Sequence, residues 1–380
     1  MLGAMALGAL LVSGCLGGCP RIKFGLSAKI VVIGGATSAP SGGHRFGVTG
    51  RAEVYDQRTP AFAKLAAGLN EPRMRHTAMR LDSGKLLVTG GENARGEYLA
   101  SAELFDPKTV EFTTTGRMST PRIAHTQTVL TDGRVLITGG LSAGQSALRS
   151  AEIYDPTRGT FAPTLGNLLA ERRHHTATPL ADEKVLIVGG SAQPSAEIFD
   201  PWTYAFTRTP GDPTAARLNH TATLLRDGRV LIAGGKDFHS GARLGSAELF
   251  DPATGTFSAT RTPMHLAREG HAASRFEYGV LITGGRSTSG DPVRSAEVFD
   301  PATGTFRALS NFMLRPRADH TAALIAVGPQ RGAILLIGGA VDKLVVQPSA
   351  ELFDPDGETF SPTANSPNPG MTLHTATIIR

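Results

Sequence analysis

The segment HTATLLRDGRVLIAGG (residues 220–235) is followed, after a loop, by SAELFDPATGTF (residues 246–257). Residues 220–225 alternate between polar and apolar, which predicts a half-buried strand. Asp227-Gly228 is a strong hairpin signal, and the apolar run after it suits a strand that is covered on both faces. Residues 247–250 predict a third strand, and the turn residues 251–255 lead into a fourth. Four short antiparallel strands in succession predict one blade of a β-propeller.

Three features of this segment recur seven times along the chain, and the glycine pairs are spaced by 45 to 56 residues. The glycine pairs begin at Gly34, Gly90, Gly139, Gly189, Gly234, Gly284 and Gly338. The glutamates of the third strands are Glu53, Glu103, Glu152, Glu197, Glu248, Glu297 and Glu351. The histidines that open the first strands are His76, His125, His175, His220, His271, His320 and His374. Seven copies of one blade unit predict an all-β, seven-bladed propeller.

The two ends of the chain complement each other. The first copy has a glycine-pair strand at residues 30–33 but no His-Thr strand before it, and residues 374–379 supply a His-Thr strand with no partner. Together they complete one blade, so we expect the C-terminal strand to close the ring and to leave no open sheet edge. Residues 21–380 then form a single propeller domain.

The repeat unit resembles the kelch repeat, in which a glycine pair closes the second strand, an aromatic-Asp pair stands in the third and an aromatic in the fourth. The resemblance covers residues 28–380 and implies four-stranded blades. Kelch blades usually carry Trp in the fourth strand, whereas this chain has a smaller aromatic there. These residues are Phe62, Phe112, Phe161, Phe206, Phe257, Phe306 and Phe360.

Residues that are present in every copy are interpreted as architecture, because a functional site needs each group once. The glycine pairs indicate positive φ or a close approach of the next blade. The seven histidines are interpreted as local hydrogen-bonding groups at the starts of the inner strands, because copies spread around a ring lie too far apart to share one metal ion. No metal site and no cofactor are predicted.

Six arginines precede the histidines by three residues, and Met371 stands at the seventh position. They are Arg73, Arg122, Arg172, Arg217, Arg268 and Arg317. One interpretation is structural pairing with the third-strand glutamates, which need partners if they are buried. The other is an electropositive mouth that binds anionic ligands, as some kelch-like propellers hold acidic peptides with arginines near this position.

The predicted loops between second and third strands vary most, from 16 residues after Gly35 to five after Gly190. Variable loops on a rigid frame are the usual place for binding. We therefore expect a monomeric, non-catalytic scaffold that binds a protein, an acidic peptide or a glycan. Copper oxidases resembling galactose oxidase share this propeller but need a Tyr–Cys crosslink for their cofactor. No cysteine follows Cys19, so the sequence excludes this oxidase chemistry.

The alternative is a carbohydrate-active enzyme similar to the sialic-acid mutarotases. Its acid–base groups would be unique loop residues. The candidates are His44, Asp237, His239 and Asp291, and each is interpreted as a solvated loop residue.

The first twenty residues predict a targeting segment rather than part of the fold. Residues 1–12 are apolar but too short to span a membrane, and residues 12–15 (VSGC) resemble a lipobox with Cys15 as the lipidated residue. Cys19 is a second, poorer match, and no basic residue precedes the apolar run, which leaves ordinary secretion or a cytosolic protein with a misassigned start as alternatives. We expect an extracytoplasmic lipoprotein held at the membrane only by its lipid anchor. The net charge of +5 comes without a basic run, so no nucleic-acid arm is indicated.

Overall fold

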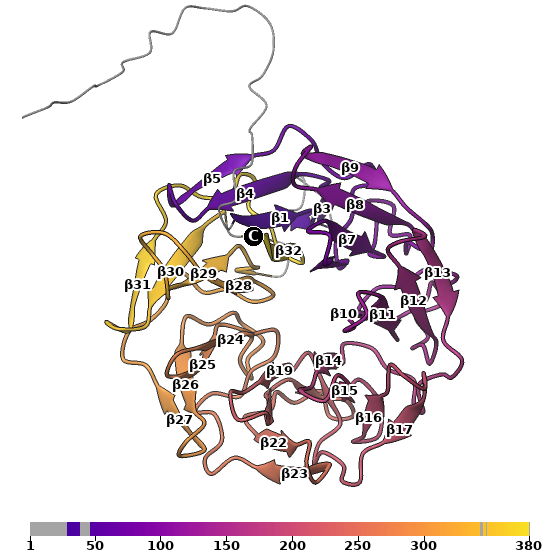
Figure 1. Cartoon of the computed structure of the whole chain (residues 1–380). Helices are drawn as coiled ribbons and strands as arrows, with labels where there is room; N and C mark the ends of the chain where they lie inside the picture. Colours follow the sequence, from indigo (N-terminus) through magenta and orange to yellow (C-terminus); the bar gives the residue numbers. More distant parts are fainter. Residues whose placement is uncertain (1–28, 39–45, 343–344, 347, 380) are drawn as a thin grey trace, which may run out of the picture.

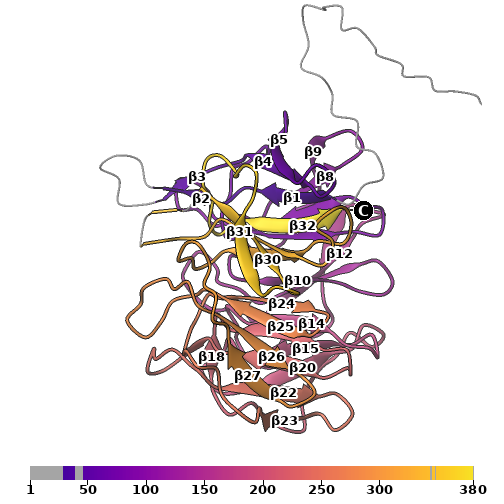
Figure 2. The same cartoon turned by 90° about the vertical axis from the view of Figure 1, so that its left-hand side faces the viewer.

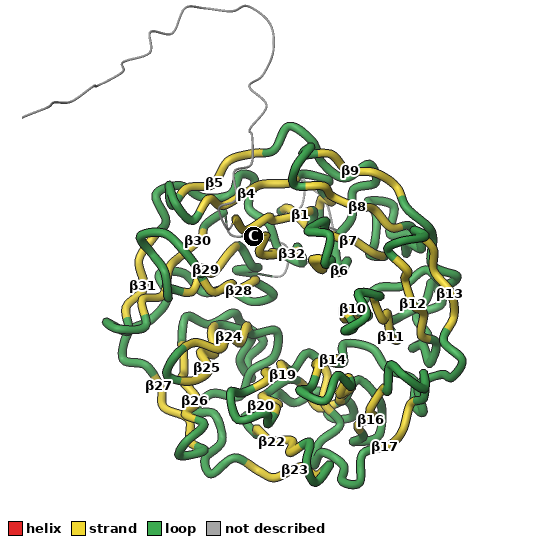
Figure 3. The backbone as a smooth tube through the Cα atoms, in the orientation of Figure 1, coloured by secondary structure: helices red, strands yellow, loops and turns green. Residues whose placement is uncertain are grey.

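The computed structural model describes residues 29–38, 46–342, 345–346 and 348–379. Within these residues the chain is all-β without a helix, and seven four-stranded antiparallel sheets stand around a central axis (Figure 1). The predicted seven-bladed β-propeller is confirmed. Figure 3 shows that each blade runs from an inner first strand to an outer fourth strand.

Every blade has the same order of strands from the axis outward. Blade 1 contains β32 (Thr375–Ile379), β1 (Lys29–Ile33), β4 (Ala52–Asp56) and β5 (Ala61–Lys64). Blade 2 contains β6 (Thr77–Arg80), β7 (Leu86–Thr89), β8 (Ala102–Asp106) and β9 (Glu111–Thr114). Blade 3 contains β10 (Thr126–Val129), β11 (Val135–Thr138), β12 (Ala151–Asp155) and β13 (Thr160–Pro163). Blade 4 contains β14 (Thr176–Pro179), β15 (Val185–Val188), β16 (Ala196–Phe199) and β17 (Phe206–Arg208).

The remaining blades follow the same order. Blade 5 contains β19 (Thr221–Leu224), β20 (Val230–Ala233), β22 (Ala247–Asp251) and β23 (Thr256–Ala259). Blade 6 contains β24 (Ala272–Phe276), β25 (Gly279–Thr283), β26 (Ala296–Asp300) and β27 (Thr305–Ala308). Blade 7 contains β28 (Thr321–Leu324), β29 (Ile334–Ile337), β30 (Ala350–Asp354) and β31 (Thr359–Pro362). Two short ladders, β2 (Ala36–Thr37) with β3 (Gly47–Val48) and β18 (Arg217–Leu218) with β21 (Lys236–Asp237), lie outside the blades.

The C-terminal strand closes the ring, as predicted. β32 pairs antiparallel with β1 over five residue pairs, from Lys29 opposite Ile379 to Ile33 opposite Thr375. The two ends of the described chain therefore meet in one sheet, and blade 1 is held by hydrogen bonds rather than by chain continuity.

The core lies between the blades. The second strands are buried along their whole length, because each blade face packs against its neighbour. Among the described residues the buried apolar side chains form seven clusters, and each cluster is shared by two adjacent blades. The aromatic of each third strand packs on the phenylalanine of the fourth, with ring centroids 4.7 to 5.1 Å apart. A phenylalanine thus provides the fourth-strand aromatic in every blade.

The glycine pairs meet both of the requirements expected of them. In blade 2, Gly90 and Gly91 have φ angles of 63° and 101°, which other residues rarely adopt. A Cβ on Gly90 would stand 2.6 Å from the carbonyl oxygen of Arg122 and 2.7 Å from the ring of His125, both from the next blade. The pairs therefore let neighbouring blades come together at the C-terminal end of the second strand.

The meander gives the disc two different faces. The loop face carries the connections between blades and the loops between second and third strands. The hairpin face carries the turns between first and second strands and between third and fourth strands. Figure 2 shows the disc from the side, with β2, β3 and β18 on the side of the loop face and the C-terminal end of β32 on the opposite side.

Candidate functional site

The six predicted arginines are fully buried, and each pairs with the third-strand glutamate of the blade that it leads into. The pairs are Arg73–Glu103, Arg122–Glu152, Arg172–Glu197, Arg217–Glu248, Arg268–Glu297 and Arg317–Glu351. The first five of these pairs have nitrogen–oxygen distances between 2.6 and 3.1 Å. Because these guanidinium groups are not accessible to a ligand in this conformation, the geometry supports the interpretation of structural pairing. A direct role in ligand binding stays a prediction that this arrangement does not favour.

A serine that was not predicted from the sequence completes each pair. In blade 3, Arg122 Nη1 donates to the carbonyl oxygens of Gly139 and Ser150, and Nη2 donates to Ser150 Oγ at 3.2 Å. Glu152 also accepts from the backbone N–H of Ser119, in the connection that enters the blade. The other serines are Ser101, Ser195, Ser246, Ser295 and Ser349. Each cluster therefore ties the blade connection, the glycine pair and the third strand together on the loop face.

Blade 1 lacks both the arginine and the serine of this cluster. Met371 stands in place of the arginine and Arg51 in place of the serine, and both substitutions occur in the same cluster. Glu53 is still buried, and its described hydrogen bond comes from the backbone N–H of Asn368 at 3.1 Å. Desolvation consequently raises the pKa of Glu53 above its usual value.

The seven histidines link neighbouring blades, so the expectation of purely local hydrogen bonds was wrong. His125 Nε2 lies 2.9 Å from Thr77 Oγ1, on the first strand of the preceding blade. Five other histidines contact the equivalent threonine, among them His76, which closes the circle on Thr375 at 3.1 Å. Where Ala272 replaces that threonine, His320 turns to Thr283 on the adjacent strand at 2.9 Å. The partner lies in another blade because the ring brings consecutive inner strands together.

Burial keeps these histidines neutral at ordinary pH. Burial lowers the pKa of His76, His175 and His271 to about 3 and that of His374 to about 4. Among the described residues no group of three or more His, Cys, Asp or Glu side chains is placed to hold a metal ion.

The residue directly before each of the seven linking histidines varies in its side chain but not in the sign of its φ angle. All seven of these positions have positive φ, between 51° and 61°. Their side chains all differ: Arg75, Ala124, His174, Asn219, Gly270, Asp319 and Leu373. Several of them bond to each other across the blades; for example, the N–H of Asp319 donates to the carbonyl of Gly270 at 2.8 Å. We call this set the variable ring. It places unlike side chains at the axis on the loop face, on a backbone that repeats.

Charged groups surround the variable ring. Arg75 pairs with Glu92 at 3.3 Å, Arg243 pairs with Glu269 at 3.0 Å, and Glu269 also accepts from Asn219. Arg286 lies 3.4 Å from Asp319. None of these residues was predicted from the sequence, although one signal was present: the position before a constant histidine differs in all seven copies.

Two members of the ring have shifted pKa values. Burial lowers the pKa of His174 to about 4, and the positive charges of Arg173 and Arg75 act in the same direction. Removal of water raises the pKa of Asp319, which the nearby Arg286 only partly opposes. His174 is therefore neutral at pH 7, and Asp319 holds its proton more tightly than a free carboxylate.

A hollow of about 500 Å³ adjoins the ring where the loop of blade 4 is short. Residues 191–195 leave a gap between the longer loops of blades 3 and 5, and Phe238 and Leu169 form its apolar walls. Arg149, Arg173 and Glu171 stand around it, and the Arg173 guanidinium lies 5.4 Å from the centre of the Phe238 ring. We call this the blade 4 hollow. Its size and mixed lining are typical of a site for a small ligand or a peptide side chain.

The loop residues considered as acid–base candidates do not converge. Asp237 caps its own turn by accepting from the N–H and Oγ of Ser240, and these bonds lower its pKa. His239 Nε2 contacts the carbonyl oxygen of Ala192 at 2.7 Å, and Asp291 accepts from Ser289. His44 and the predicted lipidation residue Cys15 lie outside the described residues.

No protein-family model matches the sequence, and no curated protein matches it. In the part of the chain that the structure describes, no helix has the length and apolar character of a membrane span.

Proposed function

We propose that the chain is a binding scaffold of the kelch type that holds a protein, a peptide or a glycan on its loop face. The observation that carries this proposal is the contrast at the variable ring. Seven equivalent positions share one backbone conformation and carry seven different side chains, while the arginines and glutamates a few residues away repeat. A repeated frame with unique groups on one face is the arrangement expected of a recognition surface.

The blade 4 hollow indicates the chemistry of recognition. Leu169 is 49% exposed, although it is apolar, and Phe238 offers an aromatic ring beside the guanidinium of Arg173. Arg149 is exposed at the rim, so an acidic group on the ligand has a cation to contact. The six buried arginines were one candidate for binding anionic ligands, and the more accessible Arg149 and Arg173 are better placed for that role.

The proposed location is the extracytoplasmic side of a bacterial envelope, with Cys15 as the lipidated residue. The support is the apolar stretch of residues 1–12 and the lipobox-like residues 12–15. Metabolic labelling with a palmitate analogue tests it: we expect label on the full chain and none on Cys15→Ser. Equal label on both proteins would contradict the assignment of Cys15.

Affinity capture from an envelope extract, with residues 21–380 as bait, tests the binding function. The site variant is Arg149→Ala with Phe238→Ala, and the matched control is Arg95→Ala on another exposed loop of the same face. We expect a partner that the native and control baits retain and that the site variant loses. A partner bound equally by all three baits would place recognition outside the blade 4 hollow.

One observation favours a second candidate, a metal-free carbohydrate-active enzyme. Asp319 has a raised pKa, His174 has a lowered pKa, and both lie within the influence of Arg75 and Glu269. An acid and a base with shifted pKa values around one opening, here both in the variable ring, are typical of proton-transfer sites. NMR measurement of anomer exchange in reducing sugars tests this candidate. An enzyme should accelerate exchange, and Asp319→Asn should abolish the acceleration while Asp237→Asn retains it.

A further inference from the structure

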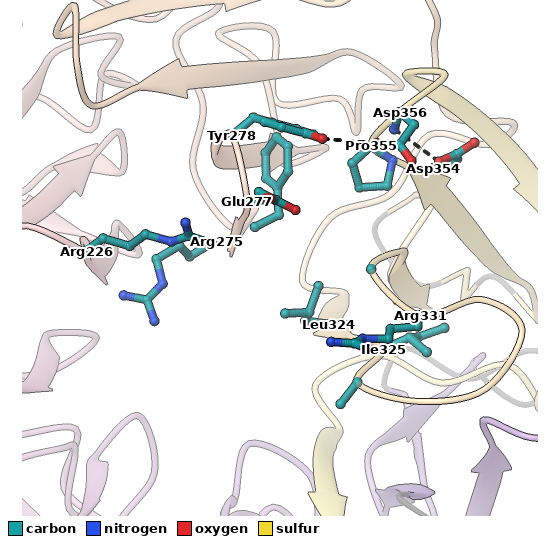
Figure 4. Close-up of a pocket in the computed structure, with 13 residues that line it drawn as sticks. Arg226, Arg275, Glu277, Tyr278, Leu324, Ile325, Arg331, Asp354, Pro355 and Asp356 are labelled. Atoms are coloured by element: carbon teal, nitrogen blue, oxygen red, sulfur yellow. Dashed lines mark hydrogen bonds between the residues drawn. The ribbon is translucent and has the colours of Figure 1, made fainter.

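A second hollow, of about 540 Å³, opens on the hairpin face between blades 6 and 7 (Figure 4). Blade 6 contributes the hairpin at residues 275–278, and blade 7 contributes its first hairpin and the turn at residues 354–356. Arg226 reaches in from blade 5. This hollow lies on the face opposite to the variable ring, so it is separate from the site described above.

The two hairpins that line this hollow depart from the repeat. In blades 3, 4 and 5 the hairpin carries an Asp that pairs with a basic residue two positions later. These pairs are Asp132–Arg134, Asp182–Lys184 and Asp227–Arg229. In blade 6 the turn is Glu277-Tyr278, and in blade 7 the hairpin is extended over residues 326–333. By the criterion that architecture repeats and function does not, these hairpins are candidates for a binding role.

Three guanidinium groups in the hollow have no carboxylate within 4 Å among the described residues: Arg226, Arg275 and Arg331. Arg275 donates one hydrogen bond, to the carbonyl of Leu224 at 3.0 Å. All three side chains are exposed. Because none of the three has an ion pair with a described residue, each is free to contact an external carboxylate.

Carboxylates occupy the other part of the hollow. Figure 4 shows Arg226 and Arg275 at one end, Arg331 apart from that pair, and Tyr278, Asp354 and Asp356 at the other end, with Glu277 between Tyr278 and the arginine pair. Tyr278 is 59% exposed, and its hydroxyl donates to Asp356 at 3.4 Å. The ring is thereby held with its face open, beside acceptors that suit hydroxyl donors. An anion alone would be repelled by these acids.

We propose that this hollow binds a polyhydroxylated carboxylate, either free or as an acidic residue of a glycan. Its carboxylate pairs with Arg226 and Arg275, its hydroxyl groups donate to Glu277 and Asp354, and its C–H face packs on Tyr278. A simple dicarboxylate lacks the donors that the acids need. A neutral sugar lacks the charge that the arginines need, so the class with both groups is selected.

Isothermal titration with four probes tests the proposal on residues 21–380. Glucuronate carries both features, succinate only carboxylates and glucose only hydroxyls, while a trigalacturonate presents the acid within a glycan. We expect glucuronate to bind at least tenfold more tightly than succinate or glucose. Tighter binding of the trigalacturonate identifies a glycan as the source, and tighter binding of glucuronate identifies the free acid.

Matched variants assign the binding to this hollow. Arg226→Gln with Arg275→Gln should weaken glucuronate binding at least tenfold, and Glu277→Gln should reduce the preference for glucuronate over succinate. Arg95→Gln, an exposed arginine on the other face, should change neither. Equal binding of succinate and glucuronate, no binding of any acid, or binding unaffected by the arginine variants would each overturn the proposal. Because both substituted arginines are exposed and lack ion pairs, an unchanged melting curve is expected and is checked first.

Discussion

Single residues in this propeller divide into those that hold the frame and those that face outward. Arg122 is a frame residue: its guanidinium is fully buried and contacts Glu152, Ser150 and Gly139 at once. A buried pair of this kind adds little over a well-packed apolar pair, but removing one partner leaves an uncompensated charge. The six pairs therefore matter mainly because removal of one partner would destabilise the fold, and less because the intact pair stabilises it.

Replacement of Arg122 by Met should lower the free energy of unfolding by about 3–5 kcal/mol, because Glu152 would stay buried without its cation. The double variant Arg122→Met with Glu152→Leu should recover most of this loss. Urea unfolding monitored by circular dichroism measures both. A loss below about 1 kcal/mol in the single variant would show that Glu152 is rescued by water or by the Ser119 amide.

At the scale of structural elements, the inner strands are joined by the histidine–threonine contacts, and burial at these contacts disfavours the charged form of the ring. The unfolded pKa of histidine is about 6.5, and the described folded values fall to about 3 or 4. At pH values between the folded and the unfolded pKa, the unfolded chain thus binds more protons than the folded chain. This contribution to stability is complete above pH 6.5 and is lost as the pH falls toward 4.

Seven such histidines make a steep acid transition. Each site contributes at most about 1.4 kcal/mol per pH unit, so seven together reach at most roughly 10 kcal/mol per unit, comparable to the whole stability of a domain. We expect acid unfolding with a midpoint above about pH 4.5, measured by circular dichroism. His125→Gln should make the transition shallower by one proton. Native spectra at pH 4 would contradict this prediction.

Strands and hairpins could be predicted from the sequence because their signals are local: alternation, Asp-Gly turns and glycine pairs. The arginine–glutamate pairing could also be proposed, since both residues repeat in step. The role of Ser150 and the link from His125 to Thr77 could not, because each depends on the geometry of the ring. Asp319 was missed for another reason: variation at one position was not interpreted as a signal.

The whole molecule depends on blade 1, which alone joins the two ends of the described chain. Deletion of residues 372–380 removes β32 and leaves β1 with an open edge, so we expect loss of cooperative melting. A circular permutant that joins Ile379 to Lys29 through a short turn, with new termini in an exposed hairpin, is the matched control and should melt like the native protein. A truncated protein with an unchanged melting curve would refute closure by this strand.

The variable ring has a consequence for how such a protein changes over time. None of its seven residues is β-branched, as expected where φ is positive, yet the set spans basic, acidic, amide, aliphatic and aromatic groups. The backbone bonds that hold the ring do not involve these side chains. Under the proposed binding function, each of these positions can therefore change singly while the backbone bonds of the ring stay in place. A combinatorial library that varies only these seven positions could be screened for binding to new ligands while the fold stays the same.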